Sequence, residues 1–136
     1  MAINIGFCRD LSTPYAETVE RVLRALHKEG FQVLAEVDIK RALEPALDGG
    51  YEHASLLTVA NPELARSLLE VDGDLSLMLP CSVVVSANGS SGSRIRITDP
   101  IHALGAVAHP RVKPLADELN RRLWRVYLDV VVVAPE

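Results

Sequence analysis

The strongest constraint on the fold of this chain is a two-residue motif that occurs three times: a short polar side chain followed by proline. The motif stands at Thr13-Pro14, Asn61-Pro62 and Asp99-Pro100. Short polar side chains accept hydrogen bonds from the free N–H groups at a helix start. Proline fits the first helical position because the donor it lacks is not needed there. An apolar, strand-like segment precedes each motif, so we expect strands to alternate with helices.

The apolar spacing after these motifs indicates where the longer helices lie. The first helix is predicted from Pro14 to Gly30, which can take the left-handed conformation that ends a helix. The last helix is predicted from about Val112, followed by an apolar tail. The two apolar stripes that define these helices comprise Tyr15, Val19, Val22, Leu23 and Leu26, and then Leu115, Ala116, Leu119, Leu123, Val126 and Tyr127.

Alternating apolar and polar residues predict the strands. The expected strands are Ile3 to Phe7, Phe31 to Val37, Tyr51 to Ala60, Cys81 to Ala87 and Ser93 to Asp99. The resulting order is β-α-β-α-β-α-β-β-α. Because hairpins and single helices mix, we predict an α+β fold with a largely antiparallel sheet and helices packed mainly on one face. We expect a single domain over residues 1–136, with an apolar C-terminal tail at about residues 128–136.

The segment "LMLPCSVVV" places a proline and a cysteine at the head of an apolar strand. Since proline cannot donate to a strand ladder, we predict that the paired strand begins at about Cys81. Alternation then places Cys81, Val83 and Val85 on the core face, where a buried thiol has a raised pKa. The alternative is a reactive thiol, which needs partial exposure and a positive neighbour such as Arg94 or Arg96.

Composition excludes several classes of function. The net charge of −4 argues against nucleic-acid binding, which needs a basic surface. No apolar run approaches the ~20 residues that span a bilayer, and the first residues lack the pattern of a signal peptide. We therefore expect a cytoplasmic protein with no membrane contact, in which Cys8 and Cys81 are reduced thiols.

Three candidate ligand-binding residues stand at predicted helix starts: Asp38, Asn61 and Asp99. Each is explained by capping alone, and Asp38 is expected to start a short helix that runs through Leu47. The free N–H groups of helix starts also bind anions. If these three ends gather on one rim of the sheet, they form a small polar pocket.

His102 follows the Asp99-Pro100 motif and is a candidate partner for Cys81. A Cys81, His102 and Asp99 cluster would resemble the layout of an activated thiol, although a solvated histidine is the simpler interpretation. The four histidines lack the helical spacing of a zinc motif, and no Cys-x-x-Cys pair exists. We therefore expect no metal and no cofactor, and we assign no catalytic residue.

Several segments carry a resemblance to a known family. The stretches "GFQVLAEVDIKRALEPAL", "ANPELARSLLE" and "LMLPCSVVV", with the Asp-Pro pair after the next strand, resemble the family catalogued as domain of unknown function 302. The resemblance runs from about Gly6 to Leu123 and implies a small prokaryotic α+β protein, often dimeric, with no agreed activity. Relatives often carry cysteine where this chain has Ala60 and asparagine where it has Ser82, so the resemblance does not imply a two-thiol role here.

Two functions of different classes remain open. The first is a small-ligand or anion-binding protein that handles a thiol or sulfur species near Cys81. The second is a non-enzymatic dimeric interaction module in which Cys81 is purely a core residue. An enzyme is the third and less expected possibility. The apolar tail predicts a homodimer, which a deletion after Asp129 should weaken.

Overall fold

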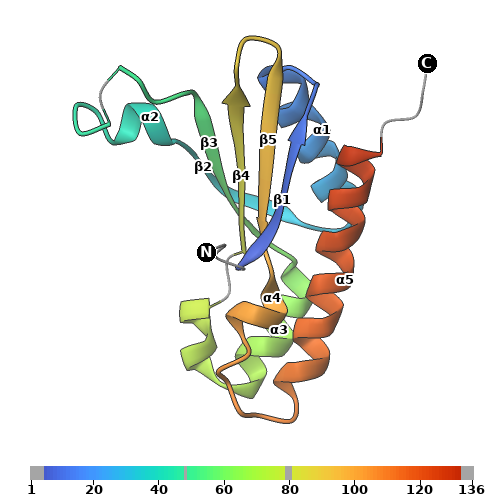
Figure 1. The fold of residues 1–136 in the computed structure, drawn as a ribbon. Helices are drawn as coiled ribbons and strands as arrows, with labels where there is room; N and C mark the ends of the chain where they lie inside the picture. The colour runs from blue at the N-terminus through green and yellow to red at the C-terminus, as the bar shows by residue number, and fades with distance from the viewer. Residues whose placement is uncertain (1–4, 48, 79–80, 133–136) are drawn as a thin grey trace.

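Five strands form one sheet in the order β1-β5-β4-β3-β2, and every neighbouring pair is antiparallel (Figure 1). The computed structural model describes residues 5–47, 49–78 and 81–132. The elements along the chain are β1 (Gly6–Leu11), α1 (Tyr15–Lys28), β2 (Gln32–Asp38), α2 (Ile39–Ala42), β3 (Ala54–Ala60), α3 (Pro62–Val71), the 3-10 helix η1 (Gly73–Met78), β4 (Cys81–Asn88), β5 (Gly92–Thr98), α4 (Pro100–Ala103) and α5 (Val112–Val131). The predicted α+β class and the antiparallel sheet are confirmed.

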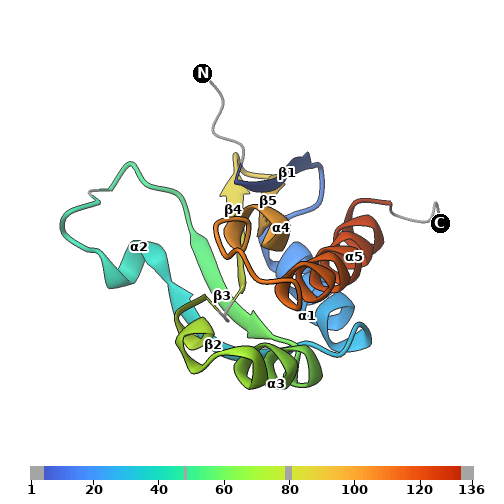
Figure 2. The same cartoon turned by 90° about the horizontal axis from the view of Figure 1, so that it is seen from below.

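The core lies between one face of the sheet and the helices α1 and α5 (Figure 2). Side chains on this face alternate with side chains on the opposite face, as the pleat of a strand requires. The fully buried members from the sheet are Leu57, Val59, Val83, Val85, Ile95 and Ile97, and those from the two helices are Val22, Leu26, Val112, Leu123 and Val126. Burial of these aliphatic side chains is the main favourable term in folding.

The β4–β5 hairpin follows its predicted alternation. Val83 and Val85 of β4 pair with Ile97 and Ile95 of β5, and all four side chains are buried. The turn passes through Gly89, whose φ of 74° lies in the left-handed region that glycine adopts at little cost. The arginines of β5 consequently point to the opposite face of the sheet.

The first strand begins later than predicted. Alternation favoured Ile3 to Phe7, but β1 runs from Gly6 to Leu11, and Ile5 precedes it with an exposed side chain. Residue 3 lies outside the described residues. The strand continues to Leu11 because β5 offers six partner residues in register, from Thr98 to Ser93. Pairing with a neighbouring strand therefore outweighs the local apolar pattern.

Two of the three polar-proline motifs cap helices as predicted. Asn61 Oδ1 accepts from the N–H of Leu64 at 3.2 Å, and Asp99 Oδ1 accepts from the N–H of Ile101 at 2.9 Å. The role predicted for Thr13 is wrong, because Pro14 is the residue that precedes α1 and no side chain caps that end.

The second helix and the strands on either side of it are shorter or less regular than predicted. The helix α2 ends at Ala42 rather than Leu47, and no residue of it is buried. A β-bulge between Val33 and Ala35 breaks the alternation of β2, which is an edge strand. β3 begins at Ala54 rather than at residue 51. Without a buried face, the short apolar pattern after Asp38 does not extend the helix.

The apolar C-terminal segment begins as a continuation of α5. The helix runs to Val131, and Val130 is a core residue with 1% of its surface exposed. Residues 133–136 of the predicted tail, and Pro80 of the predicted strand start, lie outside the described residues. None of the described helices is long and apolar enough to cross a membrane.

Candidate functional site

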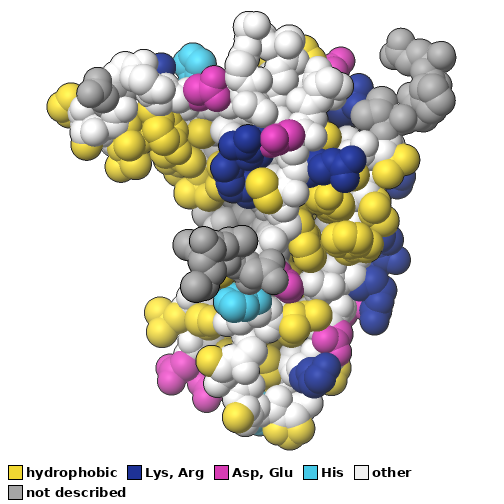
Figure 3. All heavy atoms as spheres, in the orientation of Figure 1, with side chains coloured by type: hydrophobic (Ala, Val, Ile, Leu, Met, Phe, Trp, Pro, Cys, Tyr) yellow, Lys and Arg dark blue, Asp and Glu magenta, His cyan; other side chains and the backbone are white. Residues whose placement is uncertain are grey.

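The face of the sheet opposite the core carries a mixture of polar and apolar side chains, and no helix of the α1 and α5 layer covers it (Figures 1 and 2). We call it the open face. Figure 3 looks onto it, and charged side chains gather over β1 and β5 while apolar side chains gather over β2, β3 and α2. On β4 and β5, its members are Ser82, Val84, Ser86, Arg94, Arg96 and Thr98.

A hollow of about 700 Å³ lies on the open face where β1, β5 and β4 meet α4. We call it the open-face hollow. Its lining residues are Ile5, Gly6, Phe7, Cys8, Ser82, Val84, Arg96, Ile97, Thr98, His102 and Ala103. This volume falls within the range of roughly 300–1,000 Å³ that is typical of small-molecule sites. The hollow therefore has the size of a binding site and a small number of polar groups within it.

The two arginines of the open face differ in how their charge is balanced. Arg94 forms an ion pair with Asp10 across the β1–β5 pair, and its Nη2 donates to Asp10 Oδ2 at 3.2 Å. This hydrogen bond lowers the pKa of Asp10 and raises that of Arg94. Arg96 donates to Ser86 Oγ at 3.4 Å and makes no ion pair within the described part of the chain. The charge of Arg96 is thus available to an anion.

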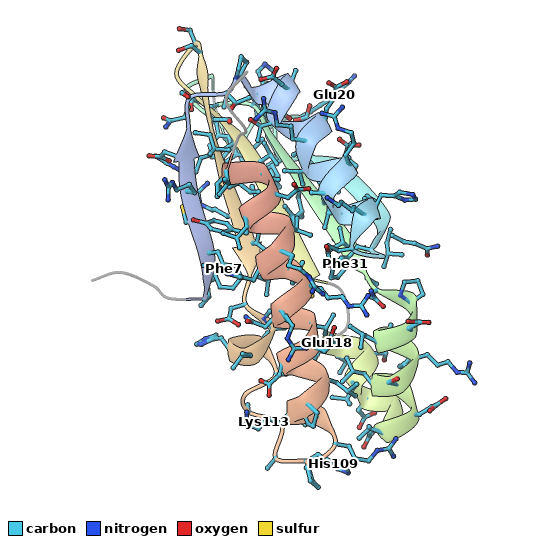
Figure 4. All side chains as sticks on the ribbon, turned by 90° about the vertical axis from the view of Figure 1, so that its right-hand side faces the viewer. Phe7, Glu20, Phe31, His109, Lys113 and Glu118 are labelled. Atoms are coloured by element: carbon cyan, nitrogen blue, oxygen red, sulfur yellow. The ribbon has the colours of Figure 1, made fainter. Side chains whose placement is uncertain are left out.

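Cys8 places an exposed thiol in the hollow, opposite Arg96 in the β1–β5 register. Cys8 was expected only to be a reduced thiol, not a site residue. A signal was present, since the alternation that predicted the strand Ile3 to Phe7 favours the core face for Phe7, and its neighbour must then face the other way. Phe7 does pack between β1 and α5, where its ring meets Trp124 at a centroid distance of 5.0 Å (Figure 4).

Cys81 lies on the opposite face of the sheet from the hollow. Its side chain is 5% exposed among Val83, Val85 and the other core residues, as predicted. Burial raises the pKa of its thiol to about 11, because a low dielectric disfavours the thiolate. The next residue, Ser82, is the one that lines the hollow.

Asp99 positions the helix that borders the hollow. Its Oδ1 accepts from the N–H of Ile101 and from Nδ2 of Asn120 on α5, each at 2.9 Å. These bonds hold α4, which contributes His102 and Ala103 to the lining. The structure therefore places His102 in the hollow and Asp99 beneath it, while Cys81 points into the core. The predicted Cys81, His102 and Asp99 cluster does not form.

Cys8 and His102 both line the hollow, yet they do not form a thiol–imidazole pair. No hydrogen bond joins Cys8 to His102 in the part of the chain that the structure describes. The described residues also contain no group of three or more His, Cys, Asp or Glu side chains that could hold a metal ion. The arrangement suits binding through a guanidinium and hydroxyl groups.

The other two predicted site residues lie away from the hollow. Asn61 is buried, caps α3, and donates through Nδ2 to the carbonyl of Glu29 at 3.4 Å. Asp38, the last residue of β2, pairs with Ser55 near the start of β3. Cys81, the first residue of β4, pairs with Val59 near the other end of β3, so Asp38 lies far from it (Figure 1). The predicted gathering of the three helix starts on one rim is wrong, since Asp38 lies at the opposite end.

Comparisons with known proteins give a family but no reaction. A family model described as "Domain of unknown function DUF302" matches residues 7–130. The chain is also similar to a solved structure from Bacillus stearothermophilus, an uncharacterized conserved protein of the same description. The two share 27% sequence identity with a TM-score of 0.81, over 91% of this chain and 96% of the other. No curated protein matches the chain.

Proposed function

Because this chain belongs to the family described as domain of unknown function 302, whose description names no reaction, we propose a function from the geometry of the open face. The protein binds a small anionic molecule in the open-face hollow. The observation that carries this proposal is Arg96, a cation without an acidic partner in the described residues, which lines a hollow of about 700 Å³.

The other groups of the hollow fit this role. Ser82 contributes a hydroxyl that makes no side-chain hydrogen bond within the described part of the chain, so it is available as a donor. Thr98 is less available, because its hydroxyl already donates to the carbonyl of Ser82 and accepts from the N–H of that residue, both at 3.2 Å. Cys8 supplies the thiol of the site, in place of the one predicted at Cys81.

The test uses Cys8 as a local reporter of occupancy. The rate of Cys8 alkylation is measured with inorganic phosphate, sulfate, acetate and octanoate, each titrated to saturation. A bound anion should slow alkylation in the wild type, and Arg96→Ala should remove this protection. Arg66→Ala on α3 is the matched control, since it removes the same charge from an exposed ion pair remote from the hollow. Unchanged alkylation with all four anions would contradict the proposal.

A second candidate function, a homodimeric interaction module, is favoured by a different surface. An exposed apolar stripe at four-residue spacing is formed by Trp124 and Leu128 of α5 and by Val132, which directly follows the helix. We propose that a second copy of the chain packs against this stripe, because a helix surface of this kind is otherwise left to water. The proposal keeps the homodimer predicted from the apolar C-terminal segment.

Light scattering at high micromolar concentration tests the dimer. Leu128→Lys should give a monomer, whereas Leu69→Lys, at an exposed position of α3, should leave the mass unchanged. The deletion after Asp129 is a poor test, because it removes the core residue Val130 and would destabilise a monomer as well. A wild-type monomer at this concentration would refute this second candidate and leave the anion site untouched.

A further inference from the structure

We propose that the ligand of the open-face hollow is an amphipathic monocarboxylate, one carboxylate joined to a short apolar chain or ring. This inference rests on the proposed anion site and specifies its chemistry. Three features of the hollow support it: the amount and geometry of its positive charge, the lack of a phosphate cradle, and the apolar residues around the charge.

The positive charge of the hollow matches a single carboxylate. Asp10 forms its ion pair with Arg94 and acts on Arg96 only at longer range, so Arg96 is the arginine of the hollow whose charge no ion pair in the described residues balances. A guanidinium presents N–H donors in a planar fork that fits the two oxygens of a carboxylate. Ser82 contributes a hydroxyl to the same hollow. A monoanion is therefore balanced by Arg96, whereas a second negative charge would find no further lysine or arginine in the lining that the structure describes.

The N-terminal end of α4 offers no site for a phosphate. The carboxylate of Asp99 occupies that end and accepts from the N–H of Ile101 at 2.9 Å. A dianion placed there would meet a negative charge and an N–H group that is already bonded. Phosphate sites normally combine several free backbone N–H groups with basic side chains. Carboxylate binding through Arg96 needs neither.

The rest of the lining is largely apolar. Apolar side chains reach the hollow from three parts of the chain: Ile5 just before β1, Val84 on β4 and Ala103 on α4. Arg96 lines the same hollow. Val84 is the Cα partner of Arg96 in the β4–β5 register, so an apolar side chain stands beside Arg96 on the open face. A ligand whose carboxylate meets Arg96 would lay its apolar part against these side chains. Burial of each added methylene should tighten binding by up to roughly fourfold.

The experiment compares ligands that separate charge from apolar length. Acetate, butanoate, hexanoate and octanoate are titrated by calorimetry and by protection of Cys8 from alkylation, with octanol as the uncharged analogue and inorganic phosphate as the polar anion. We expect affinity to rise with chain length by twofold to fourfold per methylene. Octanol should bind at least tenfold more weakly than octanoate, and phosphate should give no protection.

Substitution of the charged residue Arg96 and substitution of the apolar residue Val84 should affect binding differently. Arg96→Ala should weaken octanoate at least tenfold, and Arg96→Gln serves the same purpose if the alanine variant does not fold, as checked by circular dichroism. Val84→Thr keeps the shape of the side chain and should reduce the gain per methylene. Arg66→Ala should change neither the affinity for octanoate nor the gain in affinity per methylene.

The outcomes distinguish this inference from the proposed function. If phosphate or acetate protects Cys8 as well as octanoate does, the anion site stands and the amphipathic ligand is refuted. If no anion protects Cys8, both fail. Equal binding of octanol and octanoate would also overturn the inference. A third result would overturn the inference as well: the wild type is a dimer that does not bind octanoate, and Arg96→Ala makes it monomeric. A second copy of the chain, rather than a small ligand, would then cover the open face.

Discussion

Two thiols of the same chemical type lie on opposite faces of one sheet and acquire opposite properties. Cys8 stands on the open face of an edge strand, exposed and across from Arg96. Cys81 begins a central strand on the core face, where burial raises its pKa to about 11. Reactivity of a cysteine depends on its thiolate fraction and its exposure. The position of each residue in the pleat therefore decides which thiol is chemically accessible.

At neutral pH, we expect an alkylating reagent to label one cysteine of the native protein quickly and the other slowly. Mass spectrometry of peptides should place the fast label on Cys8 and the slow label on Cys81. In Cys8→Ala the fast phase should disappear, and in denaturant both cysteines should react together. Rapid, complete labelling of Cys81 in the folded protein would mean that its strand end is open to solvent.

The buried thiol also makes stability depend on pH. In the unfolded chain the Cys81 thiol titrates near its ordinary pKa of 9.0, while in the folded state its pKa is about 11. The folded state thus favours the protonated thiol, and the stabilisation is fully present below pH 9 and is lost as the pH rises from 9 to 11. The loss should approach about 2–3 kcal/mol for a shift of this size.

Urea unfolding at a series of alkaline pH values tests this dependence. Cys8→Ala should keep the decline of the wild type, because the thiol it removes is exposed. Cys81→Ala should cost about 1 kcal/mol at neutral pH and should show a shallower decline between pH 9 and 11. Identical slopes in both variants would show that Cys81 is not the titrating group.

The helix caps of this chain should differ in how much they contribute to the stability of the fold. Asn61 is buried and joins the start of α3 to the carbonyl of Glu29 at the end of α1. Asp38 caps the single-turn helix α2, which has no buried residue, through a 3.0 Å bond from the N–H of Arg41. Asn61→Ala should cost about 1–2 kcal/mol, and Asp38→Ala less than about 0.5 kcal/mol.

Chemical denaturation of the two alanine variants measures this difference. Asn61→Asp separates the two bonds of Asn61, because aspartate retains the cap acceptor and loses the Nδ2 donor to Glu29. It should fall between the wild type and Asn61→Ala. Equal losses for Asn61→Ala and Asp38→Ala would show that the tertiary link through Glu29 contributes nothing.

The close approach of β1 to β5 requires glycine at Gly6. A Cβ on Gly6 would lie too close to the carbonyl oxygen of Ile97, a backbone atom that cannot rotate away. Gly6→Ala should therefore destabilise the protein by about 1–3 kcal/mol. Gly73→Ala is the control, since a Cβ there meets nothing within 4 Å. Thermal unfolding compares the two, and an unchanged melting temperature for Gly6→Ala would mean that β1 shifts freely along β5.

Elements that pack into the core were predicted from the sequence more accurately than elements that do not. The β4–β5 hairpin was predicted with its faces correctly assigned, because Val83, Val85, Ile95 and Ile97 meet a packed core that enforces alternation. The start of β1 was missed because partner residues on β5 determine its length, and a pairing between distant segments leaves no local pattern. The shortness of α2 was missed for the related reason that none of its residues is buried, so no packed core enforces a longer helix.

At the scale of the whole molecule, stability is expected to be uneven. The central strands β4 and β5 are covered by α1 and lie between other strands, whereas α2 has no buried residue. Native-state hydrogen exchange should find the slowest amides in β4 and β5, near the global unfolding free energy, and fast exchange throughout α2. Protection in α2 equal to that in β5 would contradict this distribution.

The candidate site could be predicted only in part because it is assembled from separate segments. His102 and Asp99 were selected from their local motif, and both lie at or beside the hollow. Arg96 lies in a strand that was predicted from its alternation, yet its lack of an ion-pair partner in the described residues depends on Asp10 pairing with Arg94 across strands. Cys81 was chosen for its conspicuous setting after proline, whereas the thiol in the hollow is Cys8, from a strand whose start was misplaced.

The contact between Phe7 and Trp124 gives the molecule an optical property of its own. Trp124 is the single tryptophan of the chain, and its ring meets Phe7 edge-on and stacks on Tyr127 at 5.0 Å. Tryptophan emission therefore comes from one place, the seam at which the edge strand β1 rests on α5. A spectral shift that precedes the loss of far-ultraviolet ellipticity would report the peeling of that strand before the remaining sheet melts.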